Sequence, residues 1–255
     1  MAEAESDSAF ERSKYAIDET ALLKRESRSL CEITGNHVRY AGSTDLGLYT
    51  CLYEAAQAGA NHLTITSFGG PVVNAIPAAN IIASHEMSVS ILGVCASSCG
   101  NYIAPAAVRL SVLPFSVWSV HGAPEGANET ALRSAMANSG ASEEQIERSI
   151  AQNIRQSQNT VALHEAFRAR HGIQSGLYDA DLIKSAEDKL GSPNLLYLSP
   201  ETATACVPAI RAENFWGPDS PDEEAKLQQL FPSRTLGEYG ALTEGRACRE
   251  VKETK

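Results

Sequence analysis

The chain has 255 residues, of which 43% are hydrophobic, and a formal net charge of −10 at pH 7. This composition supports a well-buried core and excludes a disordered chain, while the acidic charge argues against binding to the phosphate backbone of a nucleic acid. The longest apolar runs are of strand length, far short of the roughly 20 residues that cross a bilayer. We therefore expect no nucleic-acid partner and no membrane span.

Residues 1–29 are charged and lack a clean hydrophobic period, and we interpret them as an N-terminal arm or an irregular helix. They contain no apolar stretch of the kind found in secretory signals. The chain as written therefore indicates a cytoplasmic protein. A periplasmic protein whose signal has been removed is the alternative, and the sequence does not decide between them.

Six cysteines do not settle the compartment, because a chain of this length does not need disulfides to fold. For the pair with the shortest spacing, Cys95 and Cys99, we expect buried thiols or one local disulfide. A metal site is not expected, since no second Cys/His pair has zinc-site spacing. The six positions are Cys31, Cys51, Cys95, Cys99, Cys206 and Cys248.

From residue 30 onward, strand-like and helix-like patterns alternate. The predicted strands cover 30–33, 37–40, 63–66 and 89–94, with a turn at Gly35-Asn36, and the predicted helices cover 45–59 and 72–83. This alternation indicates an α/β fold of βαβ units with a mostly parallel sheet, in which ligands bind at the carboxyl ends of strands. We assign residues 30–215 to this domain.

A capping-box pattern at Ser142-Glu143-Glu144-Gln145 opens a predicted helix of nearly 30 residues. Such a helix is about 45 Å long and has one narrow apolar stripe, so it cannot bury itself against one small sheet. We expect it to project toward a second copy of the chain, giving a homo-oligomer. The stripe consists of Ile146, Ile150, Ile154 and Val161. A further helix is predicted after Ser199, and residues 216–255 are interpreted as a peripheral tail.

Three predicted strands end in residues that can do chemistry. One is followed by the turn Gly93-Val94-Cys95-Ala96-Ser97-Ser98-Cys99-Gly100, another ends at His121, and a third ends at Gly69-Gly70-Pro71. A serine hydroxyl becomes a good nucleophile when an imidazole takes its proton, and backbone N–H groups can hold the oxyanion that then develops. The pattern predicts Ser97 as nucleophile and His121 as base.

In their order and spacing, these motifs resemble the fold shared by the Clp protease proteolytic subunit, signal peptide peptidase A and the crotonases, especially a bacterial branch of Clp-protease-like proteins of poorly defined role. The resemblance covers roughly residues 30–210. It implies a spiral of βαβ units with a long projecting helix. It also implies that Ser97, in a Gly-x-x-Ala-Ser turn, is the nucleophile, that His121 is the general base, and that the amides of Gly69 and Ser98 form the oxyanion hole. Gly70 and Pro71 are expected to bind substrate.

The chain departs from this family pattern at two points. Ser98-Cys99-Gly100 also fits one form of the serine motif, so Ser98 is an alternative nucleophile. The family places its third catalytic residue, an aspartate, just before a helix-opening Leu-Ser, where this chain offers Asn194. An asparagine can orient an imidazole but does not stabilise its charged form as a carboxylate does. Other candidates for this position are Asp179, Asp181 and Asp188.

The sequence thus favours a serine hydrolase that cleaves a peptide bond without a cofactor or metal. A non-catalytic scaffold or peptide-binding protein of the same fold is one alternative, and a crotonase-type acyl-CoA enzyme is a second. A Ser-Lys dyad would need Lys184 or Lys189 near Ser97. We identify no docking cleft for an ATPase and no phosphate-cradling loop with a lysine, so neither an unfoldase partner nor nucleotide hydrolysis is expected.

Overall fold

The computed structural model describes residues 2–243 and Cys248, and their side chains from Glu5 onward. A central sheet has the strand order β1-β2-β3-β4-β5-β8, and a short strand, β6, pairs with the end of β4. Apart from the antiparallel β1–β2 hairpin, the pairs in this sheet are parallel. The predicted α/β class with a mostly parallel sheet is confirmed. The strands are β1 (Leu30–Thr34), β2 (His37–Ala41), β3 (His62–Ser67), β4 (Ser88–Cys95), β5 (Arg109–Val112), β6 (Val117–Trp118) and β8 (Arg211–Phe215).

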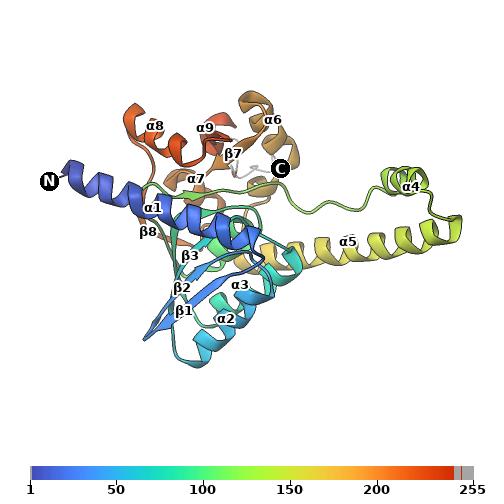
Figure 1. Ribbon diagram of the computed structural model, residues 1–255, viewed down its shortest axis with the longest axis horizontal. Helices are drawn as coiled ribbons and strands as arrows, with labels where there is room; N and C mark the ends of the chain where they lie inside the picture. The colour runs from blue at the N-terminus through green and yellow to red at the C-terminus, as the bar shows by residue number, and fades with distance from the viewer. Residues whose placement is uncertain (1, 244–247, 249–255) are drawn as a thin grey trace, which may run out of the picture.

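Helices cover the two faces of this sheet (Figure 1). On one face lie α2 (Leu46–Gln57) and α3 (Val72–Ser84), the crossover helices that the sequence predicts, and they pack against each other. The other face is crossed by α1 (Ala2–Arg25), which runs over β4. Ala16 and Ile17 of this helix are buried. The segment interpreted as an arm is thus a regular helix packed on the sheet.

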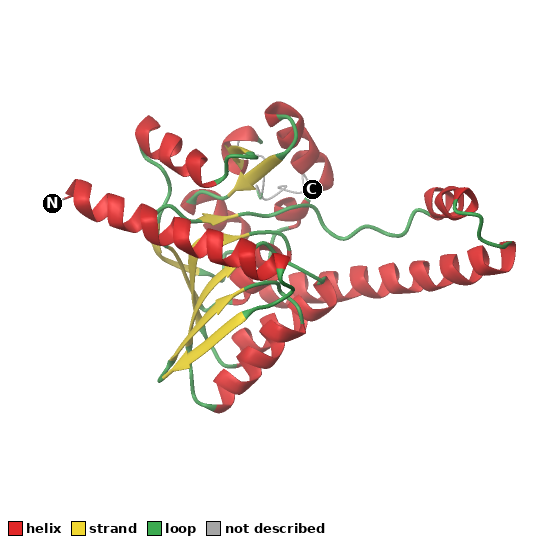
Figure 2. Cartoon of the chain, viewed as in Figure 1, coloured by secondary structure: helices red, strands yellow, loops and turns green. Residues whose placement is uncertain are grey.

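A long helix, α5 (Glu143–His171), projects from the body of the protein and carries α4 (Glu129–Asn138) at its far end (Figures 1 and 2). Its first turn has the predicted capping box, in which Ser142 and Gln145 bond each other's backbone N–H groups. Ile146 and Ile150 are buried in this region, where α4 packs against α5. Part of the apolar stripe is therefore covered by the chain itself, and the homo-oligomer stays a prediction.

Residues outside the central sheet also join the folded body. A second, two-stranded parallel sheet forms from β7 (Asn194–Tyr197) and β9 (Thr235–Glu238). Leu227, Leu230 and Phe231 are buried in the same apolar cluster as Ala9 and Ile17 of α1. The described part of the predicted tail is thus packed against the N-terminal helix, while its positions 244–247 and 249–255 lie outside the described residues. The helices of this region are α6 (Ala180–Leu190), α7 (Pro200–Cys206), α8 (Pro221–Leu230) and α9 (Tyr239–Leu242).

All six cysteines are paired in disulfides. Cys31–Cys51 ties β1 to α2, and Cys206–Cys248 ties α7 to the C-terminal segment. The third, Cys95–Cys99, spans the turn that contains Ser97. For Cys95 and Cys99, the structure has the local disulfide, one of the two states expected from the sequence, whereas the other two disulfides were not predicted. None of the helices within residues 2–243 combines the length and apolarity that crossing a bilayer requires.

Candidate active site

Ser97 lies in a sharp turn between β4 and the short helix η1 (Cys99–Ile103). Its φ of 57° is in the left-handed region, which a serine rarely adopts. Gly69 faces it so closely that a Cβ added at Gly69 would lie 2.5 Å from the Cβ of Ser97, and Gly69 itself has a φ of 90°. Any other residue at position 69 would therefore push the serine turn away. Strained backbone of this kind is concentrated at functional sites.

The turn brings Ser97 against His121, with 2.9 Å between the serine Oγ and the histidine Nε2. The other ring nitrogen, Nδ1, lies 2.8 Å from the carbonyl oxygen of Gly122. A carbonyl can only accept a hydrogen bond, so Nδ1 carries the proton and Nε2 presents its lone pair to the Ser97 hydroxyl. The pair is thus arranged for proton transfer from serine to histidine.

The backbone of His121 is held by Asn101, a residue that the sequence analysis did not single out. The Asn101 side chain donates to the His121 carbonyl over 3.1 Å and accepts from the His121 N–H over 3.3 Å. Asn101 is fully buried on η1, four positions after Ser97. Its position directly before the apolar run Tyr102-Ile103-Ala104 could have indicated this role, because an amide buried with such a run needs hydrogen-bond partners.

The helix that carries Asn101 approaches the histidine strand unusually closely at Gly100. A Cβ added there would lie 1.8 Å from the carbonyl oxygen of Ser119. The indole of Trp118 donates to the Gly100 carbonyl over 2.8 Å. Trp118 pairs in register with Cys95, at the end of the strand that leads to Ser97. The serine turn and the histidine are thus held together by backbone contacts as well as by their own hydrogen bond.

Ser98, the alternative nucleophile, is completely buried. Its hydroxyl accepts from the Gly70 N–H over 2.7 Å, lies 2.8 Å from the Gly70 carbonyl, and contacts the Thr44 hydroxyl. The structure does not bring this hydroxyl to His121. Gly70 and Pro71, expected to bind substrate, do not line the cavity at Ser97: Gly70 bonds to Ser98, and Pro71 precedes α3 as its N-cap.

The two amides expected to hold an oxyanion are not equally available. Among the described residues, the N–H of Ser98 has no hydrogen-bond acceptor. The N–H of Gly69, in contrast, donates to the Ser67 hydroxyl over 3.1 Å. The Ser98 N–H is therefore free to donate to an oxyanion, whereas the Gly69 N–H must first break its hydrogen bond to Ser67.

Among the described residues, none of the sequence candidates for a third catalytic residue has a hydrogen bond to His121. The Asn194 amide donates to the Gly191 carbonyl over 3.0 Å. Asp179 is the N-cap of α6, where its side chain accepts from the Leu182 N–H. Asp181 and Asp188 do not line the cavity at Ser97. The position facing His121 Nδ1 is taken by the Gly122 carbonyl instead.

A carboxylate nevertheless lies in the same cavity as the pair. Glu187, on α6, lines this cavity together with Ser97, His121 and Asn194. Burial of the imidazole lowers the pKa of His121, whereas the Gly122 hydrogen bond and the charge of Glu187 act in the opposite direction. No local motif marks Glu187 as special, because its relation to His121 depends on how α6 docks.

The cavity has a volume of about 230 Å³ and receives residues from both ends of the chain. Lys24 comes from the last turn of α1, and Arg234 follows α8. Neither position was identified from the sequence, since both lie in segments interpreted as peripheral. Lys184 and Lys189, the residues of the dyad alternative, do not line it.

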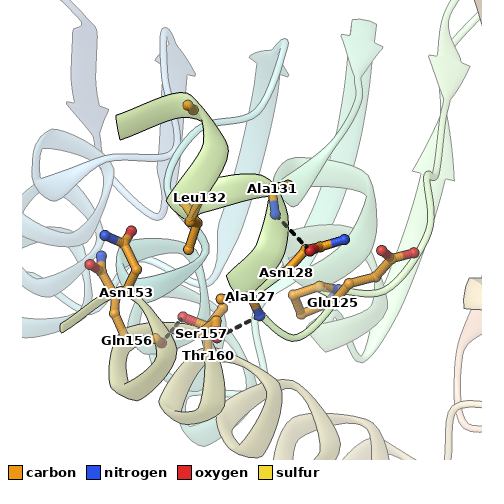
Figure 3. Close-up of a pocket in the computed structure, with 11 residues that line it drawn as sticks. Glu125, Ala127, Asn128, Ala131, Leu132, Asn153, Gln156, Ser157 and Thr160 are labelled. Atoms are coloured by element: carbon orange, nitrogen blue, oxygen red, sulfur yellow. Dashed lines mark hydrogen bonds between the residues drawn. The ribbon is translucent and has the colours of Figure 1, made fainter. Parts of the chain in front are cut away.

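A larger cavity of about 520 Å³ lies elsewhere, between α4, the chain leading to it and the middle of α5 (Figure 3). Its lining includes Leu132, Asn153 and Ser157 but no histidine, cysteine or lysine. The Ser157 hydroxyl donates to the Ile154 carbonyl and accepts from the Ala127 N–H rather than facing a base, so the cavity at Ser97 remains the candidate active site. Within the described residues, no group of three or more His, Cys, Asp or Glu side chains could hold a metal ion.

No family model and no curated protein matches this chain. The geometry of the cavity at Ser97 is therefore the basis for the functional proposal.

Proposed function

We propose that this protein is a serine hydrolase that cleaves peptide bonds and has the fold of the Clp protease proteolytic subunit and the crotonases. The observation that carries the proposal is the pair of Ser97 and His121, 2.9 Å apart in a cavity, with the serine on a left-handed turn between a strand and a helix. Such turns expose the hydroxyl of a nucleophilic serine and place backbone N–H groups beside it. The parallel βαβ units and the projecting α5 support the proposed relationship.

In the proposed reaction, the Ser97 oxygen attacks the carbonyl carbon of the substrate while His121 Nε2 takes the hydroxyl proton. The negative oxygen of the tetrahedral intermediate accepts a hydrogen bond from the Ser98 N–H, and from Gly69 when its N–H leaves Ser67. His121 then gives its proton to the leaving amine as the C–N bond breaks. In the second half of the reaction, His121 takes a proton from a water molecule as the water oxygen attacks the acyl-enzyme. His121 then returns this proton to the Ser97 oxygen as the ester bond breaks.

Glu187 is proposed to stabilise the charged form of His121 that arises during this proton transfer. The Gly122 carbonyl fixes the ring but is uncharged, so a carboxylate in the same cavity supplies what it lacks. Glu187 acts here as a positioning residue through its charge and makes no contact with the reacting atoms.

We expect Glu187→Gln to reduce kcat/KM about fivefold, because a partly solvated pair of charges contributes up to ~1 kcal/mol. The Glu187 charge raises the pKa of His121, so its removal lowers that pKa. Since His121 must be neutral to accept a proton, the acid limb of the pH–rate profile then moves to lower pH. Asp188→Asn is the matched control on the same helix. An acid limb that moves equally in both variants, or in neither, would exclude this role for Glu187.

The proposed function is tested by incubating the protein with a fluorophosphonate and measuring its intact mass, followed by peptide mapping and assays with peptide and ester substrates. We expect one adduct, on Ser97, together with turnover. A folded protein that forms no adduct and hydrolyses no substrate would instead be a non-catalytic scaffold. The hydrogen bond between the Gly69 N–H and Ser67 is the observation that favours this second function, because it occupies one oxyanion donor.

The three disulfides also support the periplasmic alternative over the cytoplasmic one. Disulfides persist in oxidising compartments and are rare in the cytosol, where thiols are kept reduced. All six cysteines are paired, and one pair encloses the proposed nucleophile. We therefore propose that the protein works in an oxidising environment.

A further inference from the structure

The cavity at Ser97 differs in charge from the rest of the chain. The whole chain carries a net charge of −10, yet the cavity is lined by two cationic side chains, Lys24 and Arg234, and by one carboxylate, Glu187. With His121 neutral, its lining has a net positive charge. A cationic cleft in an otherwise acidic protein raises the local concentration of anionic ligands.

Arg234 is held in place by contacts that leave part of its guanidinium available. One terminal nitrogen donates to the Asn194 carbonyl over 2.9 Å, and the Arg234 carbonyl accepts from the Gln228 side chain over 2.6 Å. A guanidinium has five N–H donors in a planar fork that matches the two oxygens of a carboxylate. The hydrogen bond to the Asn194 carbonyl uses one terminal nitrogen, and the other N–H donors of the guanidinium stay available for a ligand in the cavity.

Lys24 reaches the same cavity from the opposite end of the chain. Its ammonium lies 6.0 Å from the centre of the Phe68 ring, and Phe68 also lines the cavity. No carboxylate of the described residues forms an ion pair with Lys24 or Arg234. Neither cation therefore serves the fold through a salt bridge within the part of the chain that the structure describes.

We propose that Lys24 and Arg234 form a subsite for a carboxylate group of the substrate, close to the bond that is cleaved. The inference rests on the proposed hydrolase function, which requires an acyl substrate, and a carboxylate is the anionic group that peptides carry. The volume of about 230 Å³ is below the usual range of ligand pockets. Such a cavity has room for a small group, so the carboxylate and the scissile carbonyl must be near neighbours.

Two sources can supply this carboxylate: the free C-terminus of a peptide or an acidic side chain. The experiment measures the binding of short peptides to the Ser97→Ala protein, so that no chemistry intervenes. One pair of peptides differs only in a C-terminal carboxylate or amide. A second, C-terminally amidated pair carries glutamate or glutamine beside the scissile position. We expect about tenfold tighter binding of the acid in at least one pair, and the pair that shows it identifies the source.

Two further variants test whether the named cations are responsible. Lys24→Met keeps the length of the side chain and Arg234→Gln keeps a hydrogen-bond donor, so each removes mainly a charge. We expect each to weaken the preference for the acid several-fold, and the double variant to abolish it. Lys14→Met on the same helix and Arg211→Gln, both exposed and outside the cavity, are the controls and are expected to leave the preference unchanged.

Equal binding of acid and amide in both pairs would overturn the proposal, as would a preference that persists in the double variant. This outcome is separate from failure of the hydrolase function. If no adduct forms on Ser97 but the acid is preferred, the carboxylate site stands without catalysis. If the adduct forms but acid and amide bind equally, the hydrolase stands and the subsite does not.

Discussion

Replacing Ser97 by alanine is expected to abolish the fluorophosphonate adduct and peptide hydrolysis while leaving the protein folded. The Ser97 side chain is partly exposed, and its hydroxyl forms a hydrogen bond with His121. Its removal frees the Nε2 of His121, which lines the cavity, where a water molecule can replace the hydroxyl. Intact-mass measurement after labelling gives the loss of the adduct, and circular dichroism with thermal melting gives the state of the fold.

Ser98→Ala is the comparison variant for Ser97→Ala, because the two serines are adjacent in the sequence but have different hydrogen-bond partners. The buried Ser98 hydroxyl bonds to Gly70 and Thr44, so its removal is expected to destabilise the protein by about 1–3 kcal/mol. The adduct on Ser97 should still form at a temperature where this variant is folded. An adduct that persists in Ser97→Ala and disappears in Ser98→Ala would shift the nucleophile to Ser98.

We expect His121→Ala to lower kcat/KM by about three to six orders of magnitude, since a nucleophile and its base act as a unit. In the native protein, burial of the ring lowers the pKa of His121. The base is thus unprotonated at neutral pH, and activity should decline only as the pH falls through that lowered value. Steady-state kinetics over a range of pH, together with the rate of fluorophosphonate labelling, measure both effects.

His85→Ala provides the matched control for this loss. His85 is an exposed histidine at the end of α3 and does not line the cavity at Ser97. Its replacement should leave kinetics and labelling unchanged. If His121→Ala turned over substrate at the native rate, the proposed base would be wrong, and the hydrogen bond between Ser97 and His121 would have no role in catalysis.

Much of the fold was predictable because the signals that specify it are local. The alternation of strands and helices from residue 30 follows from hydrophobic periods within single segments, and the observed β1, β2, β3 and β4 match the predicted ranges to within two residues. The capping box at Ser142 and Gln145 is equally local. The N-terminal helix was less clear, because a mixed pattern of charges hides the few small residues, such as Ala16, that it buries.

For the site, the sequence alone brought out Ser97, His121 and Gly69, because each ends a strand and parallel strands end at a common edge. The sequence favoured Ser97 and kept Ser98 as the alternative nucleophile. Only the tertiary structure separated them, by exposing one hydroxyl to His121 and burying the other against Gly70. A shift of one residue reverses the direction of a side chain, and sequence patterns do not resolve so small a step.

The remaining parts of the site were decided by packing between distant segments. Lys24 and Arg234 are 210 positions apart in the sequence and reach one cavity because α1 and the C-terminal segment dock on the same body. The pairing of the six cysteines and the place of Glu187 depend on docking in the same way. Local periodicity specifies which segments become strands and helices, whereas the shapes of their buried faces specify which side chains meet, and those shapes exist only once the chain has folded.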